Sequence, residues 1–432
     1  IGDSGGNGVF YGESRSVMVS ETNPNHSSML TGAFPERHGV VGNAFAAPGA
    51  GADDDSCPDA PAGGPVPTTG ESPSCLEAET AFTALERNYP DRRFRTALIM
   101  GKDKLARLFT TEVVNPGTYD VDYAWSACED AFEYCDPEAP TNPISGYAAD
   151  DSVVMDEVIR TTREGIGDAG FQRRPNLTFA NLPAVDTAGH TSGRTSGAYA
   201  DAVVAADEQL RRFVANQREL GIWRRTVMIV TSDHSMDDTP QFAKVSLEMV
   251  LTAAGIPSSE YEIVGNGGAA HIYLEDRSRP DAAALLKEMR AALTGSPSIQ
   301  EALYLQPNPE DGGSAHTIAS ASPAWGLGGE RTGDIVVTTR PGAAVLETSE
   351  VSSFPFTPLQ GNHGGTVTRD NFWLVAGGGR VVRTADSNAA VTNANAAPTA
   401  LRALGARPPA DAQAGVAKGA FRTKFLPRRK RR

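Results

Sequence analysis

The chain has 432 residues, of which 40% are hydrophobic, and it carries a formal net charge of −14. This apolar content excludes a disordered chain, and the length suits one large domain with insertions or two domains. The negative charge argues against nucleic acid or an anionic membrane surface as the main partner, because phosphate groups repel such a surface.

In chain order, the first predicted element is a helix that begins near Thr22 or Asn23 and ends at Gly32. Thr and Asn are favoured N-caps, Pro24 suits the first turn, and glycine commonly ends a helix. Residues 44–92 follow, and they begin with a stretch rich in Ala, Gly, Asp and Pro. That composition is typical of a loop or flap.

Further along, short apolar segments bounded by Gly, Pro or polar residues predict buried strands, and segments with one apolar face predict helices. The expected strands are Phe94–Met100, Leu177–Leu182, Thr226–Thr231, Asp334–Thr338 and Phe372–Ala376. The expected helices include Tyr199–Val214, Val245–Ala254 and Ala283–Leu293. Strands that alternate with helices indicate an α/β fold with a largely parallel central sheet flanked by helices. Ligands of such sheets gather at the carboxyl ends of the strands.

The predicted organisation is a catalytic α/β core with a loop insert, a small cap subdomain with strands and helices of its own, and a C-terminal tail that ends in basic residues. These units span residues 1–239 and 361–410 (core, with the insert at 44–92), 240–360 (cap) and 411–432 (tail). No apolar run approaches the roughly 20 residues of a membrane helix.

The four cysteines are Cys57, Cys75, Cys128 and Cys135, and their spacing does not resemble that of a zinc-thiolate site. We expect two local disulfides, Cys57–Cys75 and Cys128–Cys135. The other pairings and four free thiols remain alternatives. Disulfides indicate a secreted or periplasmic protein. Because the chain starts at Ile1 rather than Met, we expect that a leader has been removed.

Asp and His residues follow two of the expected strands. Asp186-x-x-x-His190 comes after the second expected strand, Asp233-His234 follows the third, and His363 lies in a glycine-flanked loop. Each feature also has a simpler explanation. The first could be a polar turn, the Asp-His dipeptide could arise by chance, and His363 could be an ordinary surface histidine. The chain has only seven histidines, however, and two of them stand near Asp after strands. Together these residues predict a metal site, since carboxylate oxygen and imidazole nitrogen are normal zinc ligands.

Thr22 is the candidate nucleophile. At a helix N-terminus, free N–H groups and the helix dipole favour an anion, so a hydroxyl there is well placed to attack a phosphate. The alternative is that Thr22 only caps the helix.

Four stretches resemble the type I phosphodiesterase/nucleotide pyrophosphatase family of the alkaline phosphatase superfamily. They are ETNPNHSSMLTGAFPERHGVVGN (Glu21–Asn43), VDTAGH (Val185–His190), TSDHSMDD (Thr231–Asp238) and GNHGG (Gly361–Gly365). Their order agrees with the family, and the resemblance spans Thr22 to about Ala400. It implies an alkaline-phosphatase-like fold and a hydrolase that cleaves phosphodiester or pyrophosphate bonds of nucleotides or similar small esters. A phosphothreonine intermediate and two zinc ions, or other divalent metals, are implied as well.

The resemblance also implies roles for individual residues. Thr22 matches the nucleophile, and Asn43 matches a residue that holds a phosphoryl oxygen together with the backbone N–H of Thr22. His26 and His38 match structural positions. The implied ligands of one zinc are Thr22, Asp233 and His234, and those of the other are Asp186, His190 and His363.

One departure concerns a further Asp ligand that the family carries at the end of its first strand, well before the nucleophile. Only 21 residues precede Thr22 here, and no strand is predicted before Asp3. We therefore expect that the first strand is missing from this chain. The metal on the Thr22 side would then lack one carboxylate, which would weaken its binding.

Two other functions remain alternatives. A relative that cleaves phosphomonoesters or the C–P bond of phosphonoacetate shares the same site, and the Thr-Asn-Pro-Asn sequence at Thr22 is compatible with it. The second alternative is a non-catalytic relative with a binding role. The pocket for the leaving group would be lined by the inserted regions. Lys102, which follows the first expected strand, is near enough to that strand end to reach an anion, but we expect it to be a solvated surface residue.

Overall fold

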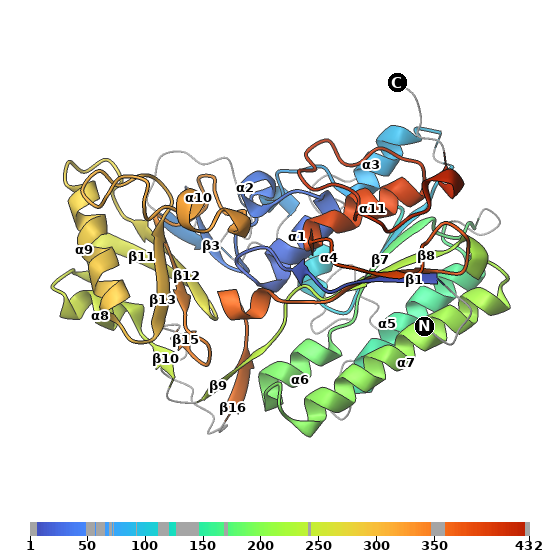
Figure 1. Cartoon of the computed structure of the whole chain (residues 1–432), viewed down its shortest axis with the longest axis horizontal. Helices are drawn as coiled ribbons and strands as arrows, with labels where there is room; N and C mark the ends of the chain where they lie inside the picture. Colours follow the sequence, from blue (N-terminus) through green and yellow to red (C-terminus); the bar gives the residue numbers. More distant parts are fainter. Residues whose placement is uncertain are drawn as a thin grey trace.

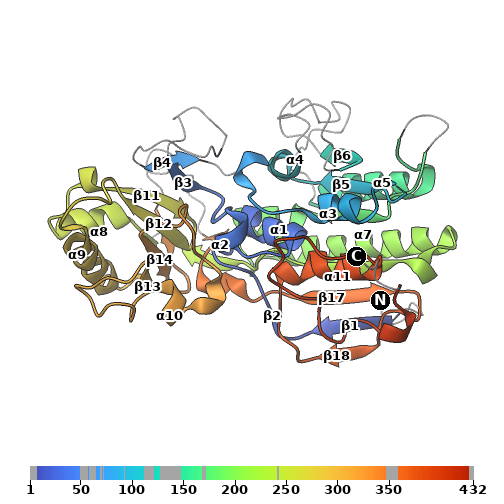
Figure 2. The ribbon, with the colours of Figure 1, turned by 90° about the horizontal axis from the view of Figure 1, so that it is seen from above.

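The computed structural model describes residues 7–48, 57, 65–68, 71, 73–91, 93–110, 121–126, 147–167, 172–240, 243–346 and 359–427. The elements from β10 to β15 lie at one end of the molecule, drawn in yellow and orange, and most of the others lie at the opposite end (Figure 1). Helix α1 lies between these two groups when the molecule is seen from above (Figure 2).

The secondary structure has the following bounds. The helices are α1 (Thr22–Thr31), α2 (Pro35–His38), α3 (Ala81–Asn88), α4 (Asp103–Phe109), α5 (Tyr147–Glu164), α6 (Ala184–Ser192), α7 (Gly197–Glu219), α8 (Leu247–Ala253), α9 (Ala282–Gly295), α10 (Ile318–Ala321) and α11 (Ala396–Ala403). The strands are β1 (Asn7–Tyr11), β2 (Ser14–Arg15), β3 (Phe45–Pro48), β4 (Pro65–Thr68), β5 (Thr96–Met100), β6 (Tyr123–Ser126), β7 (Leu177–Asn181), β8 (Val227–Thr231), β9 (Asp237–Pro240), β10 (Lys244–Val245), β11 (Tyr261–Asn266), β12 (Ala269–Leu274), β13 (Ile299–Tyr304), β14 (Ile335–Thr339), β15 (Ala344–Val345), β16 (Leu359–Asn362), β17 (Trp373–Gly377), β18 (Ala385–Ser387) and β19 (Val391–Thr392).

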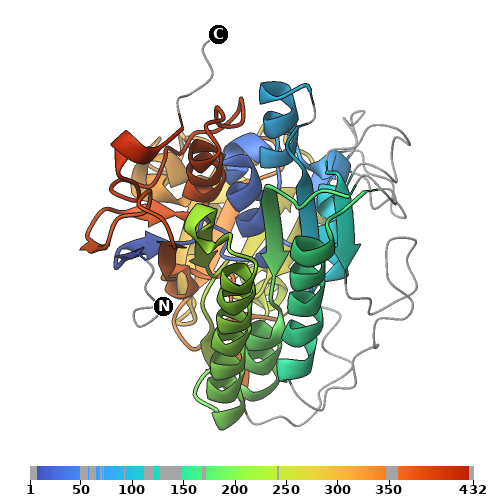
Figure 3. The same ribbon diagram turned by 90° about the vertical axis from the view of Figure 1, so that its right-hand side faces the viewer.

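The first sheet of the core has the order β6-β5-β7, and all three strands run parallel. Its central strand β5 is buried along its whole length, as its continuous apolar sequence predicted. Ala97 and Ile99 pack in a cluster with residues of α5, whereas Leu98 and Met100 join a cluster with residues of α3 and α4 on the other face. Helices therefore cover both faces, and α5 and α7 run side by side below the sheet (Figure 3).

The second sheet of the core has the order β18-β1-β17-β8, and here β17 runs antiparallel to both of its neighbours. Met228 and Ala376 pack toward α7, whereas Trp373 and Val375 pack in a cluster that includes Phe421. The α/β architecture is thus confirmed, while within these two core sheets parallel pairing holds for β5 with β6 and β7 and for β1 with β18. Apolar periodicity identifies buried strands but not their direction.

A third sheet, β11-β12-β14-β13, is antiparallel throughout. Helices α8 and α9 pack against it and share its apolar cluster. The strand expected at Asp334–Thr338 is β14, so it belongs to this sheet and not to the core. The other strands and helices expected from Phe94 to Ala376 are also present, with ends that differ by a few residues.

Two further expectations concern the two ends of the chain and the pairing of the cysteines. Residues 411–427 pack on the core, where Ala417 and Ala420 are buried, whereas Asp3 lies outside the described residues. The disulfide Cys57–Cys75 is present as predicted, and Cys128 and Cys135 lie outside the described residues. Among the described helices, none combines the length and apolar character that a bilayer crossing requires.

The disulfide predicts a measurable stability difference. Cys57 and Cys75 are 18 positions apart, and a crosslink closing a loop of that length removes roughly 3 kcal/mol of entropy from the unfolded chain. Replacing both by Ser should lower the free energy of unfolding by about 3 kcal/mol in chemical denaturation without reductant. The difference should vanish when both proteins are compared in reductant. Equal stability under oxidising conditions would contradict this expectation.

Candidate active site

Helix α1 begins at Thr22, and the residue that precedes it, Glu21, occupies the N-cap position. The prediction that Thr22 or Asn23 would be the N-cap was therefore wrong by one or two residues. Glu21 makes no side-chain capping bond, because its carboxylate contacts His363 and Asn43 instead. The predicted end of the helix is confirmed, since Gly32 follows it in the left-handed conformation with φ of 75°. Thr22 is 1% exposed.

Asp186 and His190 lie on α6, which starts shortly after β7 ends. Their spacing of four residues places both side chains on the same face of the helix. The Nε2 atom of His190 is 3.5 Å from Oδ1 of Asp186. The pair thus belongs to a helix and not to a polar turn.

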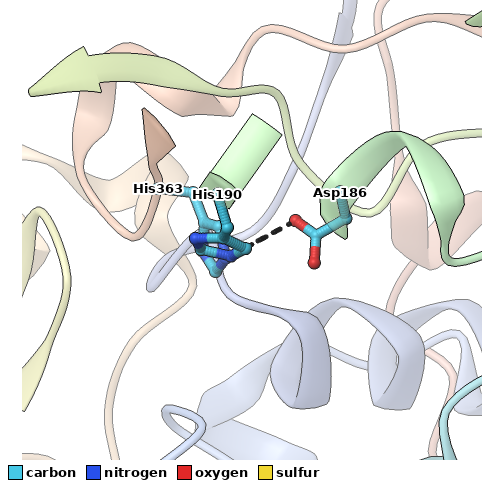
Figure 4. A group of neighbouring side chains, drawn as sticks. All are labelled: Asp186, His190 and His363. Atoms are coloured by element: carbon cyan, nitrogen blue, oxygen red, sulfur yellow. Dashed lines mark hydrogen bonds and ion pairs between the residues drawn. The ribbon is translucent and has the colours of Figure 1, made fainter. Parts of the chain in front are cut away.

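His363 follows β16 and meets this helix through a close approach of two glycines. A Cβ on Gly361 would lie 2.2 Å from the carbonyl oxygen of Gly189, so only glycine fits there. The Nε2 atom of His363 is 3.0 Å from Nε2 of His190 and 3.8 Å from Oδ1 of Asp186. One ligand atom from each of these three residues lies within 4.8 Å of the other two, and Figure 4 shows the three side chains converging.

Asp233 and His234 follow β8 and lie beside this cluster. The Nε2 atom of His234 is 3.4 Å from Oδ2 of Asp233 and 4.0 Å from Oδ1 of Asp186. The rings of His234 and His363 stack with their centres 3.7 Å apart. The two predicted ligand groups are therefore adjacent, although β7 and β8 belong to different sheets.

His26 ties Asp233 to the start of α1. Its Nδ1 atom lies 2.9 Å from the carbonyl oxygen of Thr22 and 3.5 Å from Oδ2 of Asp233. Asn393 also donates a hydrogen bond of 2.8 Å to the carbonyl oxygen of Asp233. These contacts bring the Asp233 carboxylate to the turn of the helix that carries Thr22.

Asn43 lies at the same helix end. Its side-chain oxygen accepts a hydrogen bond of 2.8 Å from the N–H of Asn23, and its amide nitrogen donates to the carboxylate of Glu21. The structure therefore places all seven residues predicted from the sequence around one region. His38 is not part of it, because its ring bonds to Ser28 and to the backbone of Val40.

At four of the candidate ligands the electrostatics favour the protonation states that a metal requires. His363 differs, because burial would lower its pKa but Glu21 raises it. Burial would raise the pKa of Asp186, but Lys102 and the neighbouring histidines hold it well below its usual range. Burial would also raise the pKa of Asp233, but His234, His26 and Lys102 together lower it. Burial lowers the pKa of His190 to about 4 and also lowers that of His234. Charged carboxylates and neutral imidazoles are the forms that bind divalent metals.

Two lysines at this site were not predicted from the sequence. The ammonium group of Lys102 lies 2.6 Å from Oδ2 of Asp186, so the expectation of a solvated surface residue was wrong. Burial would lower the pKa of Lys102, but Asp186 and Asp233 raise it. Burial would raise the pKa of Glu21, but His363 mainly lowers it, and Lys104 is near enough to contribute. Both lysines follow β5. The rule that ligands gather at the carboxyl ends of strands, which located Asp186, could therefore have located these lysines as well.

The donor atoms fit divalent metal ions. Within the described part of the chain, Oδ1 of Asp186 and Nε2 of His234 are buried without a hydrogen-bond partner. Unpaired polar atoms are costly inside a protein, and a cation between them would satisfy both. Three ligands from Asp186, His190 and His363 are the number that a catalytic zinc site uses.

Comparisons with known proteins agree with this geometry. A family model described as type I phosphodiesterase/nucleotide pyrophosphatase matches residues 6–366. No curated protein sequence gives a significant match. Among solved structures, murine ectonucleotide pyrophosphatase/phosphodiesterase 5 has a TM-score of 0.59 and 18% identity over 94% of this chain and 89% of its own.

Two other solved structures share the fold. Phosphonoacetate hydrolase from Sinorhizobium meliloti has a TM-score of 0.60 and 18% identity over 91% of this chain and 85% of its own. The alkaline phosphatase PafA has a TM-score of 0.65 and 14% identity over 96% of this chain and 92% of its own.

The site predicts metal binding that depends on Asp186. Replacing Asp186 by Asn removes a charged ligand, so the affinity for Zn²⁺ should fall by about 100-fold or more. This loss should exceed the effect of removing a residue that only hydrogen-bonds to a metal ligand. Competition with a chelating indicator measures this affinity. Asp370→Asn is the matched control, since that carboxylate is exposed and pairs with Arg15. Equal affinity in the Asp186 variant and the wild type would contradict the assignment.

Proposed function

The chain belongs to the type I phosphodiesterase/nucleotide pyrophosphatase family, and on that premise we propose that it hydrolyses small phosphate esters with Thr22 as the nucleophile. As a member of this family it is a phosphoester hydrolase of the alkaline phosphatase superfamily. The proposal adds the nucleophile, the metal ions and the substrate class. One divalent ion, most simply zinc, would be held by Asp186, His190 and His363, and a second by Asp233, His234 and Thr22.

One observation carries this proposal. The ligand atoms of Asp186, His190 and His363 cluster within 4.8 Å of one another, and the ring of His234 stacks on His363 beside them. His26 connects the same region to Thr22 and Asp233. Four distant parts of the sequence thus supply the groups on which the proposal rests.

The residues of the chain divide the chemistry as follows. Thr22 Oγ1 forms a bond to phosphorus while the bond to the leaving group breaks, and the proton of the hydroxyl ends on the leaving oxygen. Water then cleaves the phosphothreonine and regenerates the hydroxyl. The backbone N–H of Thr22 and the amide of Asn43 would meet the developing negative charge. Bound divalent ions would lower the pKa of the hydroxyl and neutralise charge on the phosphoryl oxygens.

Lys102 and Lys104 favour substrates that carry more than one negative charge over simple phosphodiesters. A phosphodiester group carries one negative charge, whereas a phosphomonoester carries up to two and phosphonoacetate adds a carboxylate. Lys102 pairs with Asp186, and Lys104 is near enough to Lys102 for the two charges to interact. Two cations beside the site suit the more highly charged substrates. The alternative of a monoesterase or C–P hydrolase therefore has a structural basis that cleavage of a simple phosphodiester does not share.

The surroundings of the site support two further parts of the proposal. We assign residues 240–360 as a cap on the core formed by 1–239 and 361–410, because the third sheet and its helices lie within that range. We also place the protein outside the cytosol, because reducing compartments rarely keep a disulfide such as Cys57–Cys75. Free thiols at both positions in protein isolated from its native source would remove the basis for that location.

The nucleophile assignment predicts a specific loss of activity. Thr22→Ala should reduce kcat on bis(4-nitrophenyl) phosphate by about ten-thousand-fold or more, because covalent catalysis is lost while binding remains. Thr22→Ser keeps a hydroxyl and should retain a larger share of the activity. Metal content should be measured in each variant, so that a loss of ions is not mistaken for a loss of the nucleophile. Full activity in Thr22→Ala would contradict the mechanism.

The lysines predict substrate preference. Lys104→Ala should lower kcat/KM for 4-nitrophenyl phosphate by about 10- to 100-fold, the value of one charge-assisted bond, and should affect the diester less. Lys104 is preferred to Lys102 for this test because Lys102 also pairs with Asp186. Lys287→Ala on α9, an exposed position, is the matched control. Equal losses on the monoester and the diester would argue against a role in discrimination.

A further inference from the structure

Glu21 is a buried carboxylate that the mechanism does not yet use. It is only 4% exposed, and it stands at the N-cap of α1 without capping the helix. Burying a carboxylate is costly unless partners stabilise its charge. Its partners therefore indicate why it is there.

One oxygen of Glu21 faces a candidate metal ligand. Its Oε1 lies 3.2 Å from Nδ1 of His363, and both side chains are almost fully buried. The other nitrogen of the same ring, Nε2, faces Nε2 of His190 and Oδ1 of Asp186. Glu21 thus lies on the side of the His363 ring that faces away from the metal ligands.

The second oxygen of Glu21 accepts a hydrogen bond from the amide of Asn43. The oxygen of that amide accepts from the N–H of Asn23, the residue after Thr22. A continuous chain of contacts therefore runs from His363 through Glu21 and Asn43 to the first turn of α1. It joins the metal cluster to the helix end that carries the nucleophile.

The backbone around Glu21 is built for this close approach. Ser20 and Gly364 exchange two hydrogen bonds, of 3.2 Å and 3.1 Å, between their main chains. Gly364 has φ of +99°, and a Cβ there would lie 2.8 Å from Oε1 of Glu21 and 1.9 Å from the carbonyl oxygen of Asn266. The loop that carries His363 can pass this close to Glu21 only with glycine at that position.

We propose that Glu21 is a positioning residue whose carboxylate orients the ring of His363 and the amide of Asn43 together. A carboxylate at Nδ1 keeps the proton on that nitrogen and leaves the lone pair of Nε2 for a metal ion. The same carboxylate fixes Asn43 beside Thr22. The inference rests on the proposed function, because it assigns His363 as a ligand, but the orientation of the ring can be measured without metal or activity.

Glu21→Gln is the first test, because it keeps the size of the side chain while removing its charge. The affinity for Zn²⁺, measured by competition with a chelating indicator, should fall by about 10- to 100-fold, as is typical when the outer partner of a metal-binding histidine is lost. In a His363→Ala background the same substitution should cause no further loss. Glu13→Gln is the matched control, since Glu13 is exposed and lies in the same segment. An unchanged affinity, or an equal loss in the His363→Ala background, would overturn the proposal.

Nuclear magnetic resonance of the histidine ring nitrogens provides the second readout. In the metal-free wild type, His363 should carry its proton on Nδ1, and in both Glu21→Gln and Glu21→Ser the signal should shift toward a mixture of the two forms. An identical His363 signal in wild type and variants would overturn the proposal even if activity fell. If the wild type bound no zinc, the proposed function would fail, whereas this spectrum would still decide the role of Glu21.

Discussion

The crowding of buried charge between α1, α6 and the loop after β16 is the constraint on which the rest of the structure depends. Glu21 is a buried carboxylate, the side chains of Asp186 and Asp233 are each only 17% exposed, and Lys102 pairs with Asp186. Buried charge of one sign is strongly unfavourable unless cations neutralise it. Divalent ions would supply that charge and would bind the unpaired oxygen of Asp186 at the same time. The same bound ions would then both stabilise this region and supply its chemistry.

The fold brings these groups together from both ends of the molecule. The core supplies the ends of β7 and β8, while the turn between β11 and β12 in the third sheet holds the loops opposite them. Within that turn, the N–H of Gly268 donates a 2.6 Å hydrogen bond to the carbonyl oxygen of His363, and Asn266 bonds to both the N–H and the carbonyl oxygen of Ala44. The third sheet is therefore part of the frame of the site, and the loops carrying Asn43 and His363 are fixed relative to each other through it.

Much of this could be predicted from sequence, because buried strands and their flanking ligands leave local patterns. The helix that begins at Thr22 and ends at Gly32 was found to within two residues, and Asp186 and His190 were recognised by their spacing. The roles of Lys102 and Glu21 were missed. Lysine and glutamate are usually solvated, and only tertiary contacts bury these two. The antiparallel direction of β17 was missed as well, because apolar character does not encode direction.

The central claim is that the chain holds two divalent ions around the hydroxyl of Thr22. Anomalous X-ray diffraction at the zinc edge from crystals grown with Zn²⁺ tests it most directly. The account predicts two strong peaks, one bound by Asp186, His190 and His363 and the other by Asp233 and His234 next to Thr22. Peaks that lie away from these side chains, or the absence of zinc from this region at saturating concentration, would contradict it.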